Sequence, residues 1–184
     1  MNLIKVAIAV VNQTPMDWPG NLRNILAAID EARAQGASLV CLPELCTTGY
    51  GCEDAFLSPD VQKRARRMLL EIAPRTQGLI VSIGLPLMYR GGLFNCACLL
   101  VDGQIQGFVA KKNLAGDGIH YEPRWFKPWP AGQVAQVELE GRTYPFGDLV
   151  FDCGGIRIGY EICEDAWAAR RPGTELAQLA VDII

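Results

Sequence analysis

Three short apolar runs in this chain each end abruptly in front of a different reactive side chain. The runs span residues 39–42, 105–110 and 156–162, and the reactive residues that follow them are Glu44 (after Pro43), Lys111 and Cys163. Runs of this length and composition predict buried strands. In open α/β folds ligands gather outside the carboxyl ends of strands, so an acid, an amine and a thiol that arrive there separately predict one converging site.

The three side chains together suit attack on a carbonyl carbon. A thiol must lose its proton to become a nucleophile, a neighbouring carboxylate can take that proton, and an ammonium stabilises the negative charge that develops. His120 is the only histidine in the chain, which makes a Cys-His pair the poorer alternative. Each residue alone has a plainer interpretation. Cys163 would be a small buried hydrophobe and Glu44 a solvated loop acid. Lys111 would form an ordinary charge pair at a strand end together with Lys112.

Around these runs the chain alternates predicted strands and helices, without repeats. Helices are expected over residues 21–34, which have an apolar stripe at helical spacing, and from Ser58 onward, with Pro59 in the first turn. Further strands are expected over residues 4–11, 79–85, 94–101 and 149–151, and a short helix over 174–179. The Asp-Gly dipeptide at 102–103 predicts a hairpin between its flanking strands, so parallel and antiparallel pairings should be mixed.

Two later segments are less regular. Residues 123–147 are rich in Pro, Gly and Trp and are expected to lack regular structure, with Trp129 packing on the core. The strands over 149–151 and 156–162 are expected to pair with each other. The final residues, 181–184, are an apolar run without a polar tail, which predicts an ending inside a strand.

Four sequence blocks resemble the signature of the nitrilase superfamily of carbon-nitrogen hydrolases. The block PEL contains Glu44, K-x-x-L contains Lys111, HYEPRWF contains Glu122 and Arg124, and E-x-C-E-D-x-W contains Cys163. The spacing selects Lys111 rather than its neighbour, because Lys111 lies three residues before a leucine. The resemblance implies a catalytic triad of Glu44, Lys111 and Cys163, with Glu122 as a further active-site glutamate.

Within this superfamily the chain most resembles the glutaminase domain of glutamine-dependent NAD synthetases, in their long, eukaryotic-like form. The segments that resemble it are PELCTTGYGCED, KKNLAGDGIHYEPRWFKPW and PFGDLVFDCGGIRIGYEICEDAW, and the resemblance covers nearly the whole chain. It departs from the general superfamily pattern at Ala115, where proline is common. The implied fold class is α/β, a nitrilase-type α-β-β-α sandwich with mixed sheets that is incomplete at the C-terminus. Residues 1–184 would be the N-terminal part of the glutaminase domain, without the rest of that domain and without the ATP-dependent synthetase domain.

The resemblance also implies a reaction. Glu44 would act as general base on Cys163, whose thiolate would attack the carboxamide of glutamine, release ammonia and leave a thioester for water to hydrolyse. Lys111 would stabilise the tetrahedral oxyanion together with the backbone N–H of Glu164. The ammonia would serve the ATP-dependent amidation of deamido-NAD to NAD in the absent domain.

Three residues are candidates for contact with the substrate. By the same resemblance Tyr50 and Glu164 would line the pocket and hold the amino-acid end of glutamine, and Glu122 would orient Lys111 or assist proton transfer. Structural alternatives stay open for each. Tyr50 could merely pack on a strand end, and Glu122 could form a surface ion pair with Arg124 that contributes little.

Composition limits the remaining classes of function. Half of the residues are hydrophobic, which is ample for the core of one domain, and the net charge of -3 gives no reason to expect a nucleic-acid partner. No apolar run approaches the roughly 18 residues of a membrane span, and no signal-type cleavage site is present, so no membrane partner and a cytoplasmic location are expected. The seven cysteines are odd in number and contain no C-x-x-C pair, so neither a disulfide framework nor a zinc site is favoured.

No metal or bound cofactor is expected in this part of the protein. ATP and Mg²⁺ would belong to the absent synthetase domain, and the full-length protein is expected to be a homo-oligomer. Two other functions stay open. A stand-alone amidase of the same superfamily would keep the triad and act on another small amide, whereas an inactive interaction module or truncated paralogue would keep the fold and have an inert Cys163.

Overall fold

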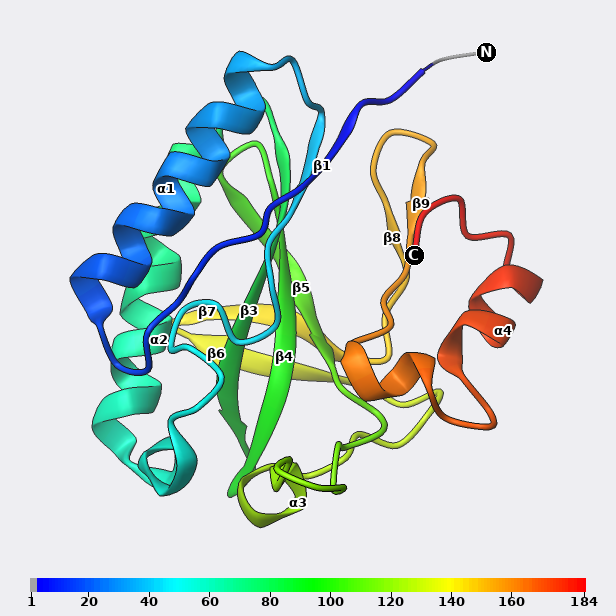
Figure 1. Cartoon of the computed structure of the whole chain (residues 1–184). Helices are drawn as coiled ribbons and strands as arrows, with labels where there is room; N and C mark the ends of the chain where they lie inside the picture. The colour runs from blue at the N-terminus through cyan, green and yellow to red at the C-terminus, as the bar shows by residue number, and fades with distance from the viewer. Residues whose placement is uncertain (1–2) are drawn as a thin grey trace.

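The computed structural model describes residues 3–184 and is built on a seven-stranded sheet with the strand order β1-β2-β3-β4-β5-β7-β6 (Figure 1). Its strands are β1 (Val6–Ile8), β2 (Leu39–Cys41), β3 (Ile80–Tyr89), β4 (Gly92–Val101), β5 (Gln104–Ala110), β6 (Val134–Leu139) and β7 (Arg142–Gly147). Pairing is parallel between β1 and β2, β2 and β3, and β5 and β7, and antiparallel between the other neighbours. The predicted mixture of parallel and antiparallel pairs is therefore confirmed.

Two helices, α1 (Trp18–Ala34) and α2 (Pro59–Ile72), cover one face of this sheet (Figure 1). Their fully buried apolar residues include Ile25, Ile29, Leu69 and Ile72. Helix α1 begins before residue 21, where its apolar stripe starts, because the Asp17 carboxylate caps it by accepting a hydrogen bond from the N–H of Gly20 at 3.1 Å. Among residues 3–184 there is no helix with both the length and the apolar character to cross a bilayer.

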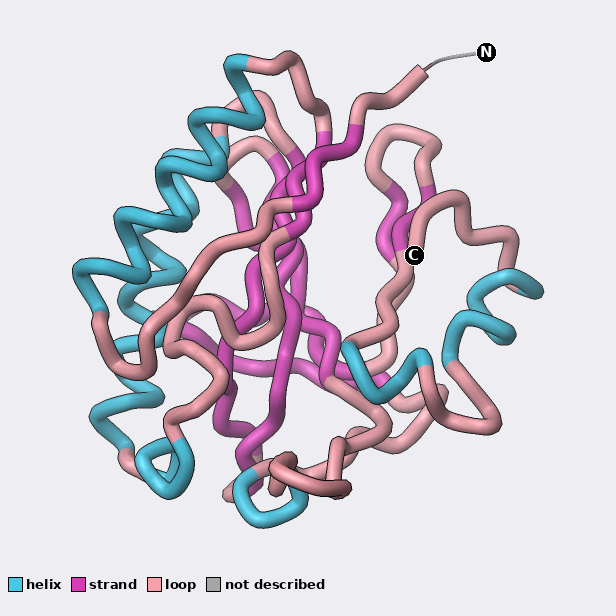
Figure 2. Tube along the Cα trace, in the orientation of Figure 1, coloured by secondary structure: helices cyan, strands magenta, loops and turns pink. Residues whose placement is uncertain are grey.

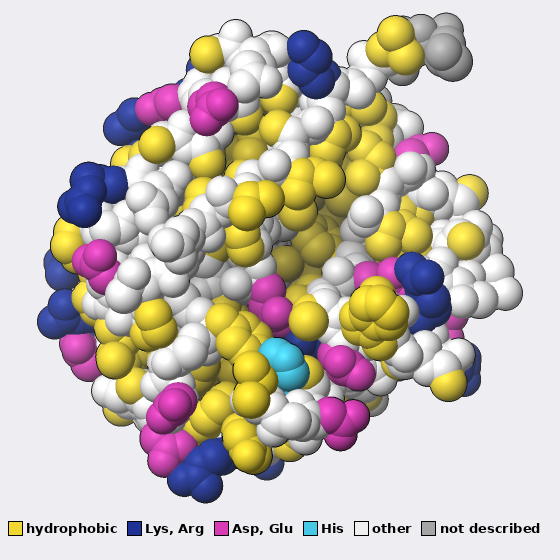
Figure 3. Space-filling view, viewed as in Figure 1, with side chains coloured by type: hydrophobic (Ala, Val, Ile, Leu, Met, Phe, Trp, Pro, Cys, Tyr) yellow, Lys and Arg dark blue, Asp and Glu magenta, His cyan; other side chains and the backbone are white. Residues whose placement is uncertain are grey.

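The other face of the sheet is only partly covered. On that side lie a two-stranded sheet of β8 (Phe151–Asp152) and β9 (Arg157–Ile158) and, beyond it, helix α4 (Pro172–Gln178) (Figures 1 and 2). The layers thus follow the order helices, large sheet, small sheet, helix, and the expected α-β-β-α arrangement of a mixed α/β protein is confirmed. Hydrophobic side chains gather in the hollow between the large sheet and the β8–β9 segment (Figure 3).

The meander β3–β4–β5 is the centre of the core. The turn between β4 and β5 has positive φ at both Asp102 (49°) and Gly103 (79°), which is the type I′ geometry that matches the twist of a hairpin. The predicted hairpin is confirmed. Cys96 and Cys98 on β4 are both buried, and they serve as packing residues.

The structure corrects three predicted segments. Residues 123–147 were expected to be irregular but contain the β6–β7 hairpin, which joins the large sheet through β7. The predicted strand over 156–162 is limited to β9, and residues 159–162 leave the ladder. The predicted strand over 4–11 pairs only over β1. The extent of a strand depends on how far its neighbour runs beside it, which apolar periodicity does not contain.

Candidate active site

Glu44 is placed by a tight crossing of two chain segments. The loop after β2 passes directly over β3 at Gly84, where a Cβ would lie 2.3 Å from the N of Leu45 and 2.6 Å from the carbonyl oxygen of Pro43. The N–H and hydroxyl of Thr47 both donate to the carbonyl of Gly84, at 3.2 and 3.1 Å. Only glycine permits this approach, so Gly84 determines where Glu44 lies.

Lys111 follows β5 and is completely buried. Its N–H donates to the carbonyl of Asn95 at 2.9 Å, which continues the β4–β5 ladder by one residue. Its ammonium donates to Oε1 of Glu44 at 2.7 Å and contacts both oxygens of Glu122, at 2.9 and 2.8 Å. Lys112 instead forms an ion pair with Asp148. The structure therefore brings Lys111, and not Lys112, to Glu44.

Glu122 is the first residue of the short helix α3 (Glu122–Trp125) and is also completely buried. Besides Lys111, its carboxylate accepts a hydrogen bond from the N–H of Ala115 at 2.7 Å. The alternative of a surface pair between Glu122 and Arg124 is wrong, because Arg124 pairs with Asp54 at 2.6 and 2.7 Å. Glu122 is the buried counter-charge that Lys111 needs in addition to Glu44.

Asn95 on β4 was missed by the sequence analysis. It is 1% exposed, and its Nδ2 donates to Oε1 of Glu44 at 2.7 Å and to Oε1 of Glu122 at 3.0 Å. A signal was available, since Asn95 is the only strongly polar side chain within the apolar strand β4. Buried polar groups are nearly always hydrogen-bonded, so an isolated amide in a core strand indicates buried polar partners.

Cys163 lies at the start of a 3-10 turn, Cys163–Ala166, rather than at the end of a strand. Its φ of 48° is in the left-handed region, a strained conformation that often accompanies functional side chains. The turn is fixed by Asp165, which is 1% exposed. The Asp165 carboxylate accepts hydrogen bonds from the N–H of Asn113 at 2.7 Å and from the N–H of Ile162 at 3.1 Å. Asp165 thereby ties the cysteine turn to the chain segment that follows Lys111.

The charges of the cluster oppose one another at the thiol. Burial raises the pKa of the Cys163 thiol, the negative charges of Glu44 and Glu122 raise it further, and the positive charge of Lys111 lowers it. The net result is a pKa above the ordinary value. For Lys111, burial lowers the pKa, but the two carboxylates outweigh burial and raise it. The resting site thus contains an ammonium and a protonated thiol beside a carboxylate in contact with that thiol.

Tyr50 lies at the mouth of this cluster. Burial raises the pKa of its phenol, and the charges of Glu122, Glu44 and Cys163 raise it further, so the ring lies within the electrostatic field of the cluster. Its hydroxyl lies 3.3 Å from Nδ1 of His120, and both line a hollow of about 760 Å³. A second substrate candidate, Glu164, lines a different hollow of about 450 Å³. The structure brings Tyr50 to the cluster but does not bring the Glu164 side chain into the same hollow.

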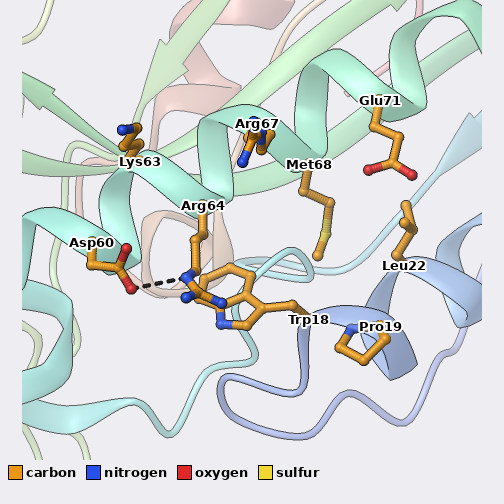
Figure 4. A pocket seen from close by; sticks show the side chains of 9 residues that line it. All are labelled: Trp18, Pro19, Leu22, Asp60, Lys63, Arg64, Arg67, Met68 and Glu71. Carbon is orange, nitrogen blue, oxygen red and sulfur yellow. Dashed lines mark hydrogen bonds and ion pairs between the residues drawn. The ribbon is translucent and has the colours of Figure 1, made fainter.

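A separate cavity of about 470 Å³ opens on the outside, between α1 and α2 (Figure 4). Its lining includes Trp18 and the pair of Arg64 and Asp60, with the guanidinium 5.9 Å above the Trp18 ring. None of its lining side chains is a cysteine, serine or histidine. This cavity contains no member of the cluster formed by Glu44, Lys111, Glu122 and Cys163.

Comparison with known proteins identifies relatives of the whole chain. A family model described as carbon-nitrogen hydrolase matches residues 5–184. The glutamine-dependent NAD(+) synthetase of Drosophila melanogaster is 34% identical over 98% of this chain and 24% of its own length. A putative glutamine-dependent NAD(+) synthetase of Schizosaccharomyces pombe is 35% identical over 98% of this chain and 27% of its own length. The chain thus spans about a quarter of the length of these relatives.

Solved structures give the same grouping. The crystal structure of a glutamine-dependent NAD(+) synthetase from Cytophaga hutchinsonii superposes with a TM-score of 0.86 at 46% identity, over 88% of this chain and 28% of that one. An amidase of the nitrilase superfamily from Nesterenkonia AN1 shares the fold, with a TM-score of 0.69 at 23% identity, over 90% of this chain and 57% of that one. Since the family model extends over nearly every residue and includes Glu44, Lys111 and Cys163, the chain belongs to the carbon-nitrogen hydrolase family.

Proposed function

We propose that this chain is the glutamine-hydrolysing part of a glutamine-dependent NAD synthetase. The observation on which the proposal rests is the buried Lys111 ammonium, held by Glu44 and Glu122 beside Cys163. That arrangement provides a nucleophile, a base and a fixed positive charge in one place. The relatives named glutamine-dependent NAD(+) synthetase align with almost the entire chain and support glutamine as the substrate.

The first half of the reaction forms a thioester. Glu44 takes the proton of the Cys163 thiol as sulfur attacks the carboxamide carbon of glutamine, so that the raised thiol pKa is overcome by transfer to a base in direct contact. The tetrahedral intermediate then collapses. Glu44 returns the proton to the departing nitrogen, the C–N bond breaks, and ammonia leaves.

The second half restores the enzyme. Glu44 takes a proton from water, and the resulting hydroxide attacks the thioester carbon. The C–S bond then breaks as Glu44 returns the proton to sulfur, which releases glutamate and the Cys163 thiol. Lys111 faces the oxyanion in both halves, because two carboxylates fix its ammonium and its charge is present before the reaction starts. The backbone N–H of Glu164 is the second donor in this proposal.

Substrate recognition is assigned to the mouth of the cluster. In this proposal Tyr50 contacts the amino-acid end of glutamine, which would enter the hollow that Tyr50 lines together with His120. Glu164 would contact the same end only after moving out of its separate hollow. Glu122 has no substrate role in this proposal and acts as the counter-charge that orients Lys111.

The remaining expectations concern the rest of the synthetase. ATP, Mg²⁺ and deamido-NAD would bind outside residues 1–184, and the protein would act in the cytoplasm as a homo-oligomer. A related synthetase from Acinetobacter baumannii, 28% identical over the whole of this chain, has a structure described as a complex with ADP. This supports the use of an adenine nucleotide by the complete enzyme.

The test is ammonia release from glutamine by the full-length protein, with and without ATP and deamido-NAD, beside a Cys163→Ala variant. We expect release that deamido-NAD stimulates and that Cys163→Ala abolishes. Release that survives in Cys163→Ala would refute the assignment of the nucleophile. Hydrolysis of another small amide, with none of glutamine, would identify a stand-alone amidase, and an inert Cys163 would identify an interaction module.

A further inference from the structure

One amide on the central strand β4 contacts both carboxylates of the cluster. Nδ2 of Asn95 donates to Glu44 at 2.7 Å and to Glu122 at 3.0 Å, over sequence separations of 51 and 27 residues. Carboxylate oxygens accept hydrogen bonds and do not donate, so the nitrogen of the amide must be the atom that faces them. This fixes the orientation of the Asn95 side chain.

The other half of the amide is left unsatisfied. Within residues 3–184, Oδ1 of Asn95 is buried and has no hydrogen-bond partner. A buried carbonyl oxygen without a donor is costly to folding and is rare in native proteins. An apolar residue would remove that cost, so the amide is better explained by what its nitrogen does than by core stability.

Asn95 and Lys111 bind the same oxygen of Glu44. Both donate to Oε1, at 2.7 Å each, and the carbonyl of Asn95 also accepts the N–H of Lys111 at 2.9 Å. With Oε1 occupied by two donors, Oε2 is the oxygen left for the proton of Cys163. The carboxylate is thereby held in one rotation about its terminal bond.

We propose that Asn95 is a positioning residue of the reaction, which holds the Glu44 carboxylate with one oxygen directed at Cys163 and couples it to Glu122. This inference rests on the proposed function, in which Glu44 is the base. Within residues 3–184, the side-chain hydrogen bonds of Asn95 go to Glu44 and Glu122 and not to Cys163. It acts through Glu44, in the same way that residues behind a metal ligand or a catalytic histidine fix the orientation of that group.

The proposal predicts a shift in pH dependence. Four titratable groups face the Glu44 carboxylate or share its charge field: Lys111, Glu122, Cys163 and Tyr50. Asn95→Ala removes a hydrogen bond that stabilises the Glu44 carboxylate, so the acidic limb of the activity profile should lie at higher pH. In Asn95→Ala the acidic limb of the kcat/KM profile should move up by about one pH unit. In Asn95→Asp it should move further, because a third carboxylate adds negative charge.

The experiment measures glutamine hydrolysis by the full-length protein across pH 5 to 10 for wild type, Asn95→Ala, Asn95→Asp and Cys96→Ala. Cys96 is the next residue on β4, is buried in the core on the opposite face, and forms no contact with the carboxylates. Cys96→Ala should lower the unfolding temperature and leave the acidic limb in place. Both Asn95 variants should shift the limb and lower kcat/KM at neutral pH by about 10²-fold.

The outcomes separate the two proposals. An acidic limb that stays within about 0.2 pH units of wild type in folded Asn95→Ala or Asn95→Asp, while Cys163→Ala is inert, overturns the role of Asn95 alone. Hydrolysis of glutamine by Cys163→Ala overturns the proposed function. Asn95→Asp nearly conserves the side-chain shape, so it decides the question where Asn95→Ala fails to fold.

Discussion

At the scale of single residues, the site is defined by an imbalance of charge. One ammonium, Lys111, is surrounded by two carboxylates, and neither Lys111 nor Glu122 is exposed to solvent. A buried ion pair gains little stability over apolar packing, although removal of one partner is strongly destabilising. The cluster is therefore understood better as a device that sets the protonation of Cys163 than as a source of stability.

This imbalance predicts opposite effects of two substitutions on thiol reactivity. Glu44→Gln removes a negative charge and a direct contact, both of which raise the pKa of Cys163, so alkylation by iodoacetamide should begin at lower pH. Lys111→Met removes the charge that lowers this pKa, so alkylation should begin at higher pH. In each variant the pH at which alkylation of Cys163 is half-maximal should move by about one pH unit. The measurement is the pH dependence of alkylation, resolved for each cysteine by mass spectrometry of peptides.

Cys41 is the internal control, because burial raises the pKa of its thiol, a hydrogen bond with Ser82 lowers it, and no charge of the cluster contributes. Its alkylation profile should be the same in all three proteins. A Cys163 midpoint that moved in the same direction in both variants would contradict the electrostatic account.

At the scale of elements, the crossing of the β2 loop over β3 depends on the absence of one methyl group. Gly84→Ala would force a Cβ to within 2.3 Å of the Leu45 nitrogen, so the loop that contains Glu44 must move. We expect a loss of about 1–3 kcal/mol in the free energy of unfolding, with a larger loss of activity than of stability. Chemical denaturation and glutamine hydrolysis would measure the two effects.

Gly116→Ala is the matched control for Gly84. A Cβ there would meet Pro123 at 3.6 Å, an ordinary van der Waals contact. The free energy of unfolding of the Gly116→Ala protein should stay near that of the wild type. A Gly84→Ala protein with unchanged stability and activity would show that the loop has room that the structure does not indicate.

The turn of Cys163 depends on a carboxylate that accepts hydrogen bonds on both oxygens. In Asp165→Asn one oxygen becomes an NH₂ group that faces the N–H of Ile162 or Asn113, so at least one hydrogen bond is lost. We expect a loss of about 1–3 kcal/mol in stability and slower formation of the thioester. Denaturation and rapid-quench kinetics would measure these effects.

Asp182→Asn is the control for the cysteine turn. The Asp182 carboxylate also accepts a backbone N–H, that of Arg157 at 2.7 Å, but in an exposed position away from the cluster. The Asp182→Asn substitution should leave the rate of thioester formation unchanged. Equal kinetic effects of the two substitutions would argue against a specific role for the Asp165 contacts.

Elements with local signals could be predicted from the sequence, and those defined by distant partners could not. Pro59 and the Asp-Gly turn locate a helix start and a hairpin within a few residues. The β6–β7 hairpin was missed because its short alternating strands lie in a Pro- and Trp-rich segment. In the site, strand-end positions pointed to Glu44 and Lys111. Asn95 was missed because its contact with Glu44 exists only once residues 51 positions apart are brought together.

At the scale of the whole molecule, one apolar surface is open. Ile8 at the end of β1 is 80% exposed, and Val10, two residues further along the chain, is 95% exposed. Strand β1 is also the edge of the large sheet, so its outer backbone groups have no neighbouring strand in residues 3–184. Exposed apolar edge strands favour association.

This surface predicts that the 184-residue chain, prepared alone, associates with itself as concentration rises. Ile8→Lys places a charge on the open strand and should shift the chain toward monomer. Light scattering coupled to size-exclusion chromatography would measure the mass. Leu57→Lys is the control, since Leu57 is 52% exposed and lies away from β1, and it should leave the association unchanged. A monomeric wild-type chain at high concentration would contradict the prediction.

The hydrogen bonds of Asp165 to the segment after Lys111 also bear on the order in which the site folds. Glu44, Asn95, Lys111 and Glu122 all precede the cysteine turn, and their mutual contacts need no residue after 122. During synthesis the N-terminal part of a chain can fold before later residues leave the ribosome. The charged cluster can therefore form before Cys163 has been synthesised. Cys163 joins the cluster afterwards, so the reactivity of its thiol reports when the turn Cys163–Ala166 has docked on the residues that precede it.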